Sequence, residues 1–211
     1  MEIISFKNID STHKYIQNAL KNGKITPPVL IVADKQENGV GSRGNKWISK
    51  DGNLFLSFCV KMKQLPKDLP IQSTSIYFAY MLKDILSARG SDIWLKWPND
   101  FYMDEKKIGG VITVKTGENI ICSIGLNLRD APHNFGKLDI RINKDLLIEE
   151  FVKKIKKNFS WKQVFSKYKI EFHKTKKFCF HLDENIVSLK DAKLNQDGSI
   201  TVNDKKVFSA R

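Results

Sequence analysis

The residues of this chain that are best suited to chemistry lie in a glycine-rich stretch, Q-E-N-G-V-G-S-R-G-N-K-W, which spans residues 36–47. Glycine has no side chain, so repeated glycines let the backbone adopt positive φ or come close to a ligand. Arg43 and Lys46 add positive charge, and Trp47 adds an aromatic face. Groups of these types can bind a phosphate and cover a flat ring. The stretch therefore predicts a loop that binds an anion or a nucleotide.

The residues that follow this loop exclude three common phosphate-binding motifs. Gly39, Gly41 and Gly44 match G-x-G-x-x-G, but a dinucleotide-binding loop must lead directly into a helix. Here a turn at residues 47–53 leads into a predicted strand at residues 54–60. A Walker A loop ends in Gly-Lys-Ser/Thr, and a protein kinase needs His-Arg-Asp and Asp-Phe-Gly, none of which occurs. The sequence thus predicts a strand–loop–strand clamp of another kind.

Two further groups of residues could serve the same ligand. Lys96, Asn99 and Asp100 lie in the run K-W-P-N-D, where a proline ends a predicted strand. Such a run is also an ordinary strand end, because Asn, Asp and Pro are common in turns. Lys107 precedes the glycine pair at residues 109–110, and glycines within a strand often mark the close approach of a ligand or another backbone. A lysine ammonium there could bind a carboxylate or a phosphate.

The elements that must position these groups alternate between strands and helices. Asp10, Ser11 or Thr12 can cap the first predicted helix, and Ser160 can cap the last. Apolar periodicity predicts strands at residues 3–9, 29–33, 54–60, 93–97, 101–103, 111–115 and 120–124, and helices at residues 12–22, 76–89, 145–159 and from residue 161. Short strands from residue 178 onward predict a small C-terminal β-barrel or meander. The fold class is therefore α/β (α+β), with a mixed sheet flanked by helices.

Opposite charges on the predicted helix at residues 145–159 are spaced to form ion pairs. Glu149 and Lys153, and likewise Glu150 and Lys154, are spaced to pair at i,i+4.

The whole chain of 211 residues carries a net charge of +13, concentrated in residues 137–177. There the lysines alternate with an apolar stripe, as on a solvated helix face. Only five of the 36 basic residues are arginine, the type favoured for bidentate phosphate recognition, so a nucleic-acid-binding module is a secondary hypothesis.

Cysteine usage and hydropathy bear on the compartment. Cys59, Cys122 and Cys179 are far apart, and each lies in an apolar run. They are expected to be buried free thiols in a reducing compartment, without disulfides or metal-binding spacing. The N-terminus does not resemble a signal peptide, and no apolar run approaches the length of a membrane span. We therefore expect a cytoplasmic protein with no membrane partner.

Taken together, these motifs give the chain a family resemblance. It resembles the biotin–protein ligases, also called biotin–[acetyl-CoA-carboxylase] ligases, over essentially its whole length. The pieces follow the family's order with similar spacing, and K-W-P-N-D after such a loop is highly specific. They are Asp10-Ser11-Thr12, Gln36 before Gly39-x-Gly41-x-Arg43-Gly44-x-x-Trp47, Lys96-Trp97-Pro98-Asn99-Asp100, Lys107-x-Gly109-Gly110 and Gly125-x-Asn127. The resemblance implies a class II synthetase-like catalytic domain at residues 1–174 and a small β-barrel domain at residues 175–211.

The resemblance also implies an activity. ATP with Mg2+ would convert biotin to biotinyl-5′-AMP, and a lysine of a biotin carboxyl carrier protein of acetyl-CoA carboxylase would then accept the biotin. This chemistry requires no enzyme nucleophile, and the sequence offers no convincing catalytic triad. The chain begins at the catalytic domain, so we expect a monofunctional form without an N-terminal DNA-binding domain and without a DNA partner. Relatives dimerise, and the sequence leaves a homodimer open.

Individual residues receive roles from the same resemblance. Lys107 and Arg43 are the expected catalytic residues, with Asp100 as a contact through magnesium and no other metal ligand expected. The expected biotin-binding residues are Ser11, Thr12, His13, Gln36, Gly39, Val40, Gly41, Ser42, Lys107 and Gly110. The expected nucleotide-binding residues are Arg43, Gly44, Trp47, Lys96, Asn99, Asp100 and Asn127.

Some positions depart from the family pattern. Val40 and Ser42 stand where arginine is frequent, which should weaken retention of the adenylate or change how the loop orders. His13 stands where asparagine is common, while His133, His173 and His181 have no ligand spacing and are expected at the surface. Lipoate ligases and octanoyltransferases of the same fold are the alternative, but their Arg-Arg-x-x-Gly-Gly-Gly stretch is absent.

Overall fold

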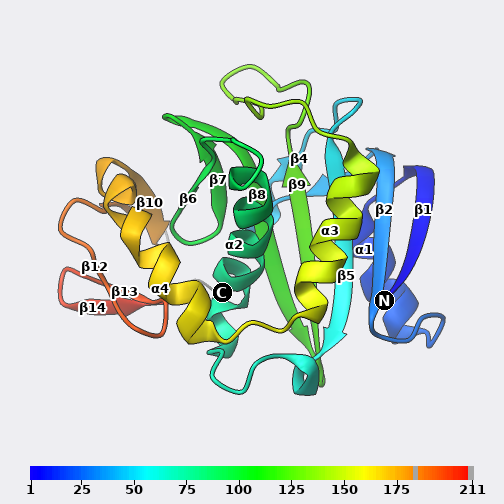
Figure 1. Ribbon diagram of the computed structural model, residues 1–211, viewed down its shortest axis with the longest axis horizontal. Coiled ribbons are helices and arrows are strands. Elements are labelled where there is room, and N and C mark those ends of the chain that lie inside the picture. The colour runs from blue at the N-terminus through cyan, green and yellow to red at the C-terminus, as the bar shows by residue number, and fades with distance from the viewer. Residues whose placement is uncertain (183–184, 209–211) are drawn as a thin grey trace.

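A seven-stranded mixed sheet organises the protein, as a computed structural model shows for residues 1–182 and 185–208 (Figure 1). The strand order is β1-β2-β5-β9-β8-β7-β6. β1 and β2 pair in parallel, and the other neighbours pair antiparallel. The strands are β1 (Glu2–Ile9), β2 (Val29–Gln36), β5 (Leu54–Lys61), β6 (Trp94–Lys96), β7 (Asp100–Met103), β8 (Lys106–Thr116) and β9 (Asn119–Leu126).

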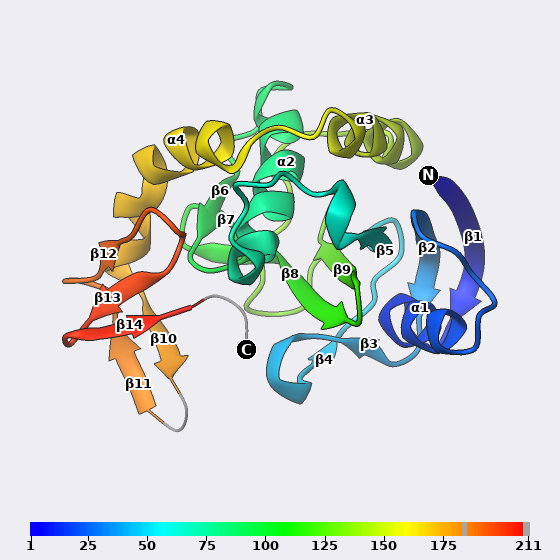
Figure 2. The same cartoon turned by 90° about the horizontal axis from the view of Figure 1, so that it is seen from below.

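The helices divide between the two faces of this sheet. α2 (Thr74–Ser87), α3 (Lys144–Lys156) and α4 (Trp161–Glu171) cover one face, while α1 (Thr12–Lys21) lies on the other (Figure 2). A short hairpin of β3 (Gly39–Val40) and β4 (Lys46–Trp47) lies beside α1 on that second face. The predicted mixed sheet with flanking helices is thus confirmed. In the described part of the chain, no helix combines the length and apolar character needed to cross a membrane.

Local sequence signals explain where two of the helices begin. The Ser11 side chain accepts a hydrogen bond from the Lys14 backbone N–H, so Ser11 is the cap that the sequence left open among three residues. Ser160 and Gln163 form a reciprocal capping box at the start of α4. Both predicted caps are therefore confirmed at the level of single hydrogen bonds.

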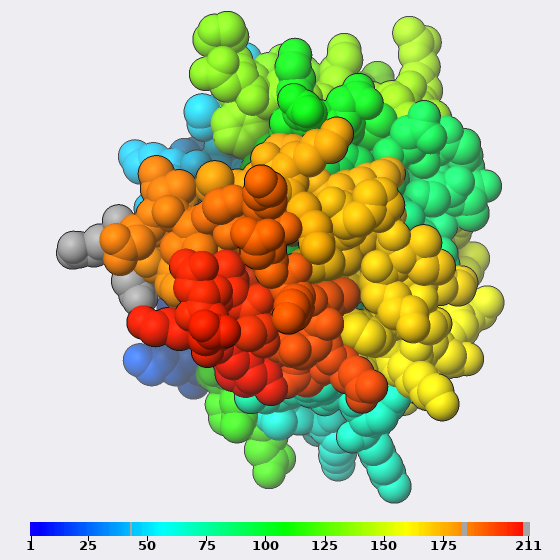
Figure 3. Space-filling model, turned by 90° about the vertical axis from the view of Figure 1, so that its left-hand side faces the viewer, coloured from blue at the N-terminus to red at the C-terminus, as the bar shows by residue number. Residues whose placement is uncertain are grey.

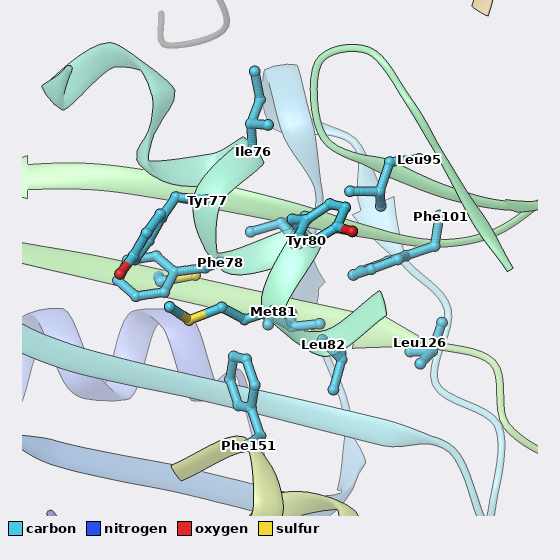
Figure 4. Packing of buried hydrophobic residues seen from close by; sticks show 14 of the residues in the cluster. Ile76, Tyr77, Phe78, Tyr80, Met81, Leu82, Leu95, Phe101, Leu126 and Phe151 are labelled. Carbon is cyan, nitrogen blue, oxygen red and sulfur yellow. The ribbon is translucent and has the colours of Figure 1, made fainter. Parts of the chain in front are cut away.

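The core lies between the sheet and the helices α2 and α3. α2 is almost entirely buried, and its Phe78 meets Phe58 of β5 edge to face at 4.8 Å between ring centroids. Phe151 of α3 approaches the same Phe58 ring at 5.7 Å. Figure 4 shows Phe78 and Phe151 among the side chains of this core. Removing this apolar surface from water is the main favourable term in folding. The packed helices hold one face of the sheet rigid and leave the other face to carry a site.

The C-terminal segment forms two small antiparallel sheets on one side of the molecule (Figure 1). Figure 3 shows the face of the molecule that this segment, coloured orange to red, covers. One pairs β10 (Cys179–Leu182) with β11 (Asn185–Ser188), and the other joins β12 (Lys193–Leu194), β13 (Ile200–Val202) and β14 (Lys205–Val207). Buried side chains of this segment, such as Phe180 and Ile200, belong to the same hydrophobic cluster as the main sheet. The segment therefore shares its core with the rest of the chain.

Trp97 connects that segment to the sheet. Its side chain is 1% exposed, and its indole Nε1–H donates to the Gly198 carbonyl at 2.9 Å. Its backbone N–H donates to Thr175 Oγ1 at 3.2 Å, and the ring meets Phe180 edge to face at 5.3 Å. One residue of the K-W-P-N-D run is thus a structural anchor.

Two local expectations were wrong, because contacts between residues far apart in the sequence decided them. Cys179 was expected to be buried, but it is exposed, since it lies at the start of the small sheet rather than in the main core. Glu150 and Lys154 do not pair with each other. Glu150 instead accepts a hydrogen bond from Arg89, and Lys154 pairs with Asp84 of α2. Glu149 and Lys153 do pair, at 3.9 Å.

Replacing Trp97 tests its anchoring role. Trp97→Ala should lower the free energy of unfolding by about 3–5 kcal/mol, because it leaves a cavity between the sheet and the C-terminal segment. Denaturant unfolding followed by circular dichroism measures this change. Ile170→Ala is the control, since that side chain is 71% exposed and its loss should change stability by less than about 0.5 kcal/mol. Equal effects of the two variants would contradict the anchoring role.

Candidate active site

Two connected cavities lie on the face of the sheet that carries α1 and the β3–β4 hairpin. The first has a volume of about 340 Å³ and the second about 640 Å³, within the usual range for ligand sites. The residues that line both are His13, Val40, Gly41, Ser42, Asn45, Asn99, Asp100, Lys107 and Ile112. Residues from the glycine-rich loop and from β7, β8 and β9 thus meet around one space.

A row without large side chains forms the floor of this space. Asp100 of β7 pairs with Gly110 of β8, which pairs with Gly125 of β9. A methyl group at Gly125 would lie 2.6 Å from the ring of Trp47, so the indole needs a glycine beneath it. A methyl group at Gly110 would lie 3.1 Å from Asp100 Oδ1. The glycines therefore make room for the functional groups above them.

Lys107 and Asp100 form an ion pair over this floor. Lys107 Nζ lies 2.7 Å from Asp100 Oδ1, and the two side chains are 27% and 19% exposed. Both residues line both cavities. A partly buried lysine with one carboxylate partner still has ammonium N–H groups that can donate to an anionic ligand. The pair is the charged centre of the site.

One end of the first cavity is polar and hydrogen-bonded. Thr12 donates from both its backbone N–H and its hydroxyl to Gln36 Oε1, at 2.9 and 3.0 Å. The Thr12 hydroxyl also lies 2.8 Å from Ser57, Ser57 lies 2.7 Å from Ser123, and Ser123 lies 2.8 Å from His13 Nδ1. Burial lowers the pKa of His13 from its ordinary value, which keeps the ring neutral at pH 7. This end suits a neutral polar group.

Another part of the first cavity is aromatic. Trp47 and Phe135 lie at 6.4 Å between ring centroids, close to perpendicular. Trp47 Nε1 is one of the buried polar atoms with no partner among the described residues. Asn127 donates from its amide to the Gly136 carbonyl at 3.1 Å and so ties down the loop that carries Phe135. A flat ring with an acceptor at its edge would match this part.

Most of the predicted site residues meet around the two cavities, and a few lie elsewhere. Lys96 lines the second cavity only, where its ammonium lies over the rings of Tyr102 and Phe178. Those lining the first cavity are Thr12, His13, Gln36, Val40, Gly41, Ser42, Trp47, Asn99, Asp100, Lys107 and Gly110.

The remaining predicted residues have other positions. Ser11 caps α1, and Gly39 packs against Trp47, its partner across the hairpin. Gly44 closes the loop with φ of +75°, and Asn127 lines a small adjoining cavity beside Trp47 and Phe135. The Arg43 side chain lies outside the part of the chain that the structure describes. One Nδ2–H of Asn99 donates to the Val111 carbonyl, which holds the amide against β8.

Several lining residues were missed by sequence reasoning. Ser123 and Phe135 lie in the wall of the first cavity, and Cys179, Phe180 and His181 close one side of the second. His181 is exposed, as expected, yet it faces ligand space. The serines of β5 and β9 are opposite each other in register, but their spacing along the chain does not reveal this. The other lining residues to which the sequence gave no role are Asn45, Leu56, Val111, Ile112 and Ile124 in the first cavity and Ser75, Thr113 and Val114 in the second.

The remaining ionisable groups offer little alternative chemistry. Burial raises the pKa of Cys59 to about 11 and raises that of Cys122 strongly, so neither thiol is a nucleophile at neutral pH. No group of three or more His, Cys, Asp or Glu side chains in the described residues could hold a metal ion. The cavity walls therefore offer a cation, aromatic rings and hydrogen-bonding groups, and the thiol among their described residues is the exposed Cys179 at the second cavity.

Comparison with known proteins places this geometry in a family. The model of the biotin/lipoate A/B protein ligase family matches residues 5–128. The bifunctional ligase/repressor BirA of Escherichia coli (strain K12) is 32% identical over 127 residues, which are 57% of this chain and 38% of that protein. BirA of Bacillus subtilis (strain 168) is 30% identical over 132 residues, which are 60% of this chain and 40% of that protein. The chain thus matches about two fifths of the length of these curated relatives.

Solved structures cover far more of the chain. A structure named biotin acetyl coenzyme A carboxylase synthetase from Helicobacter pylori, with bound biotinylated ATP, has a TM-score of 0.93 and 42% identity over 98% of this chain and 99% of that one. The biotin protein ligase from Aquifex aeolicus has the same fold, with a TM-score of 0.71 and 23% identity over 99% of this chain and 96% of that one. This chain belongs to the biotin/lipoate A/B protein ligase family.

Proposed function

We propose that this protein is a biotin–protein ligase, which activates biotin with ATP and transfers it to a lysine of an acceptor protein. The observation that carries the proposal is the Lys107–Asp100 pair, which lines both cavities and shares the first one with neutral polar groups and an aromatic pair. Such a space fits a ligand with a polar head, a carboxylate in the middle and a nucleotide beyond it. The Helicobacter pylori structure with biotinylated ATP supports this choice of ligand.

In the first step, the biotin carboxylate would attack the α-phosphorus of ATP, and pyrophosphate would leave with the electrons of the broken P–O bond. Both reactants are anions, so a cation between them lowers their repulsion and stabilises the charge that develops. Lys107 lines both cavities, which supports a role in which it would bind the carboxylate and the α-phosphate together. Trp47 and Phe135 would contact the adenine, while Thr12, Gln36 and His13 would contact the polar head of biotin.

In the second step, the amine of the acceptor lysine would attack the biotinyl carbonyl carbon, and the C–O bond to AMP would break. The amine loses a proton in this step, and AMP leaves as an anion. No enzyme nucleophile is needed, which agrees with the buried, inert thiols near the sheet. The proposed roles of Arg43, Lys96, Asn99 and Asn127 in nucleotide binding rest on family resemblance.

Magnesium fits this site as an ion held mainly by ATP. Mg2+ in phosphate sites usually keeps several waters and takes one or two protein carboxylates. Asp100 is the carboxylate that lines both cavities, so it would contact the ion. Bound there, magnesium would neutralise phosphate charge during the first step.

The acceptor that we propose is a biotin carboxyl carrier protein of acetyl-CoA carboxylase. The net charge of +13 would favour an acidic partner, since complementary charge speeds encounter. We propose a cytoplasmic location, because three free cysteines are typical of a reducing compartment. We also propose that residues 1–174 form the catalytic part and residues 175–211 a supporting part.

Removing the cation tests the proposed role of Lys107. Lys107→Ala should slow formation of biotinyl-AMP by about 100-fold or more, the usual cost of losing a preorganised charge stabiliser. Pyrophosphate release in the presence of biotin and MgATP measures the first step. Lys106→Ala is the matched control, because this neighbouring lysine is exposed and lines neither cavity. Near-normal turnover of Lys107→Ala would refute the assignment.

Crowding Trp47 tests the proposed adenine contact. Gly125→Ala places a methyl group against the indole and should raise the KM for ATP by roughly 3- to 10-fold, the worth of one aromatic contact. Steady-state kinetics with varied ATP measure this change. The affinity for biotin without nucleotide is the internal control and should change less. An unchanged KM for ATP would show that the adenine base does not contact Trp47.

Comparing two acids tests the alternative substrate. Isothermal titration with biotin and with lipoate, each with and without MgATP, should show binding of biotin only. Mass spectrometry of the retained small molecule should then identify biotinyl-AMP. Retention of a lipoyl adenylate instead would keep the family and overturn the proposed substrate.

A further inference from the structure

A continuous chain of hydrogen bonds runs beneath the polar end of the first cavity. It links Gln36, Thr12, Ser57, Ser123 and His13, from four different elements, through contacts of 2.7–3.0 Å. Each of these side chains is at most 8% exposed. Buried polar groups of this kind need partners, because an unpaired one costs about 1–3 kcal/mol. The chain is therefore a built feature of the site.

The direction of this chain is fixed at the Gln36 end. The Thr12 backbone N–H can only donate, so the Gln36 atom at 2.9 Å from it is the carbonyl oxygen. That oxygen can only accept. The Thr12 hydroxyl, 3.0 Å from the same oxygen, must therefore point its single proton at Gln36.

Each later contact then has one possible donor. With its own proton used, Thr12 Oγ1 must accept from the Ser57 hydroxyl. Ser57 must in turn accept from Ser123, and Ser123 must accept from His13 Nδ1. A neutral imidazole carries one proton, so the proton on Nδ1 leaves Nε2 with a free lone pair.

That lone pair has access to the ligand space. The His13 ring lines both cavities. Within the described residues, no hydrogen bond reaches Nε2, and Nε2 is not among the buried atoms that lack a partner. A nitrogen in this state can accept a hydrogen bond from a ligand.

We propose that the Gln36–Thr12–Ser57–Ser123 chain locks His13 in the Nδ1–H form, so that Nε2 accepts a hydrogen bond from an N–H group of the substrate's polar head. The proposal rests on the proposed function, which makes this donor an N–H of the cyclic urea of biotin. His13 is then a specificity-determining residue, and Ser57 and Ser123 are positioning residues. The lowered pKa of His13 agrees with a neutral ring.

This assignment explains how the site would reject lipoate. The dithiolane ring of lipoate has no N–H group and would leave His13 Nε2 without a donor. A site built to hydrogen-bond a substrate group rejects analogues without it strongly, because its own polar atoms are left unpaired. Because the dithiolane ring carries no N–H group, His13 Nε2 would stay unpaired in any orientation of that ring.

Nitrogen-15 NMR of the histidine rings tests the tautomer in the ligand-free protein. His13 is assigned by the signals lost in His13→Asn, and it should show the Nδ1–H pattern near neutral pH. In Ser57→Ala the Ser123 proton loses its acceptor and can turn toward His13, so the ring should shift to the Nε2–H form. An Nε2–H pattern in the unaltered protein, or an unchanged tautomer in Ser57→Ala, would overturn the proposal.

Biotin affinity supplies the functional half of the test. Ser57 is fully buried and lines neither cavity, yet Ser57→Ala should weaken biotin binding by about tenfold, the effect of about 1.4 kcal/mol. Ser123→Ala, which removes the acceptor of the Nδ1 proton, should weaken binding similarly. Ser91→Ala is the control, since Ser91 is also buried but bonds to Asp139 at the far edge of the sheet.

The outcomes separate the two proposals. If the unaltered protein does not bind biotin, the proposed function fails, while the tautomer measurement still decides the direction of the chain. If biotin binds and both serine variants bind it as tightly as Ser91→Ala does, the proposed role of the hydrogen-bond chain is refuted. Thermal unfolding of all three variants identifies any loss caused by misfolding.

Discussion

The site depends on one steric constraint, a row of positions across β7, β8 and β9 that must be free of bulky side chains. Gly110 and Gly125 are neighbours in this row, and Asp100 stands at its end. Nearby, a methyl group at Gly109 would lie 2.6 Å from the Gly125 carbonyl oxygen, a backbone atom that cannot move aside easily. Glycines weaken the strands that contain them, but they leave room for an indole and an ion pair to lie directly on the sheet. Without that clearance there would be no cavity.

Polar groups on this floor are arranged by charge as well as by shape. The ion pair of Lys107 and Asp100 lines the same cavity as a neutral hydrogen-bonded group of side chains and an aromatic pair. In the proposed reaction two anionic substrates repel each other, so a cation beside them contributes more than a nucleophile would. The described residues accordingly provide binding and orientation, which can lower a barrier substantially without covalent chemistry.

The C-terminal segment contributes to the site as well as to stability. Trp97 anchors it to the main sheet, and residues of β10 close one side of the second cavity. A segment of this size could not bury enough apolar surface by itself. Because it shares the core of the main sheet, the segment has a fixed position. In that position it forms a wall of the second cavity, although it carries no recognisable motif.

The sequence by itself determined the succession of strands and helices, the caps at Ser11 and Ser160, and the residue types of the loop and of K-W-P-N-D. These follow from apolar periodicity, local hydrogen bonding and glycine spacing, which act within a few residues. Only the tertiary structure decided that Ser57 meets Ser123, that Lys154 pairs with Asp84 rather than Glu150, and that Phe135 faces Trp47. Such contacts join residues far apart in the chain, and strand register and helix packing set them through the burial of the whole core.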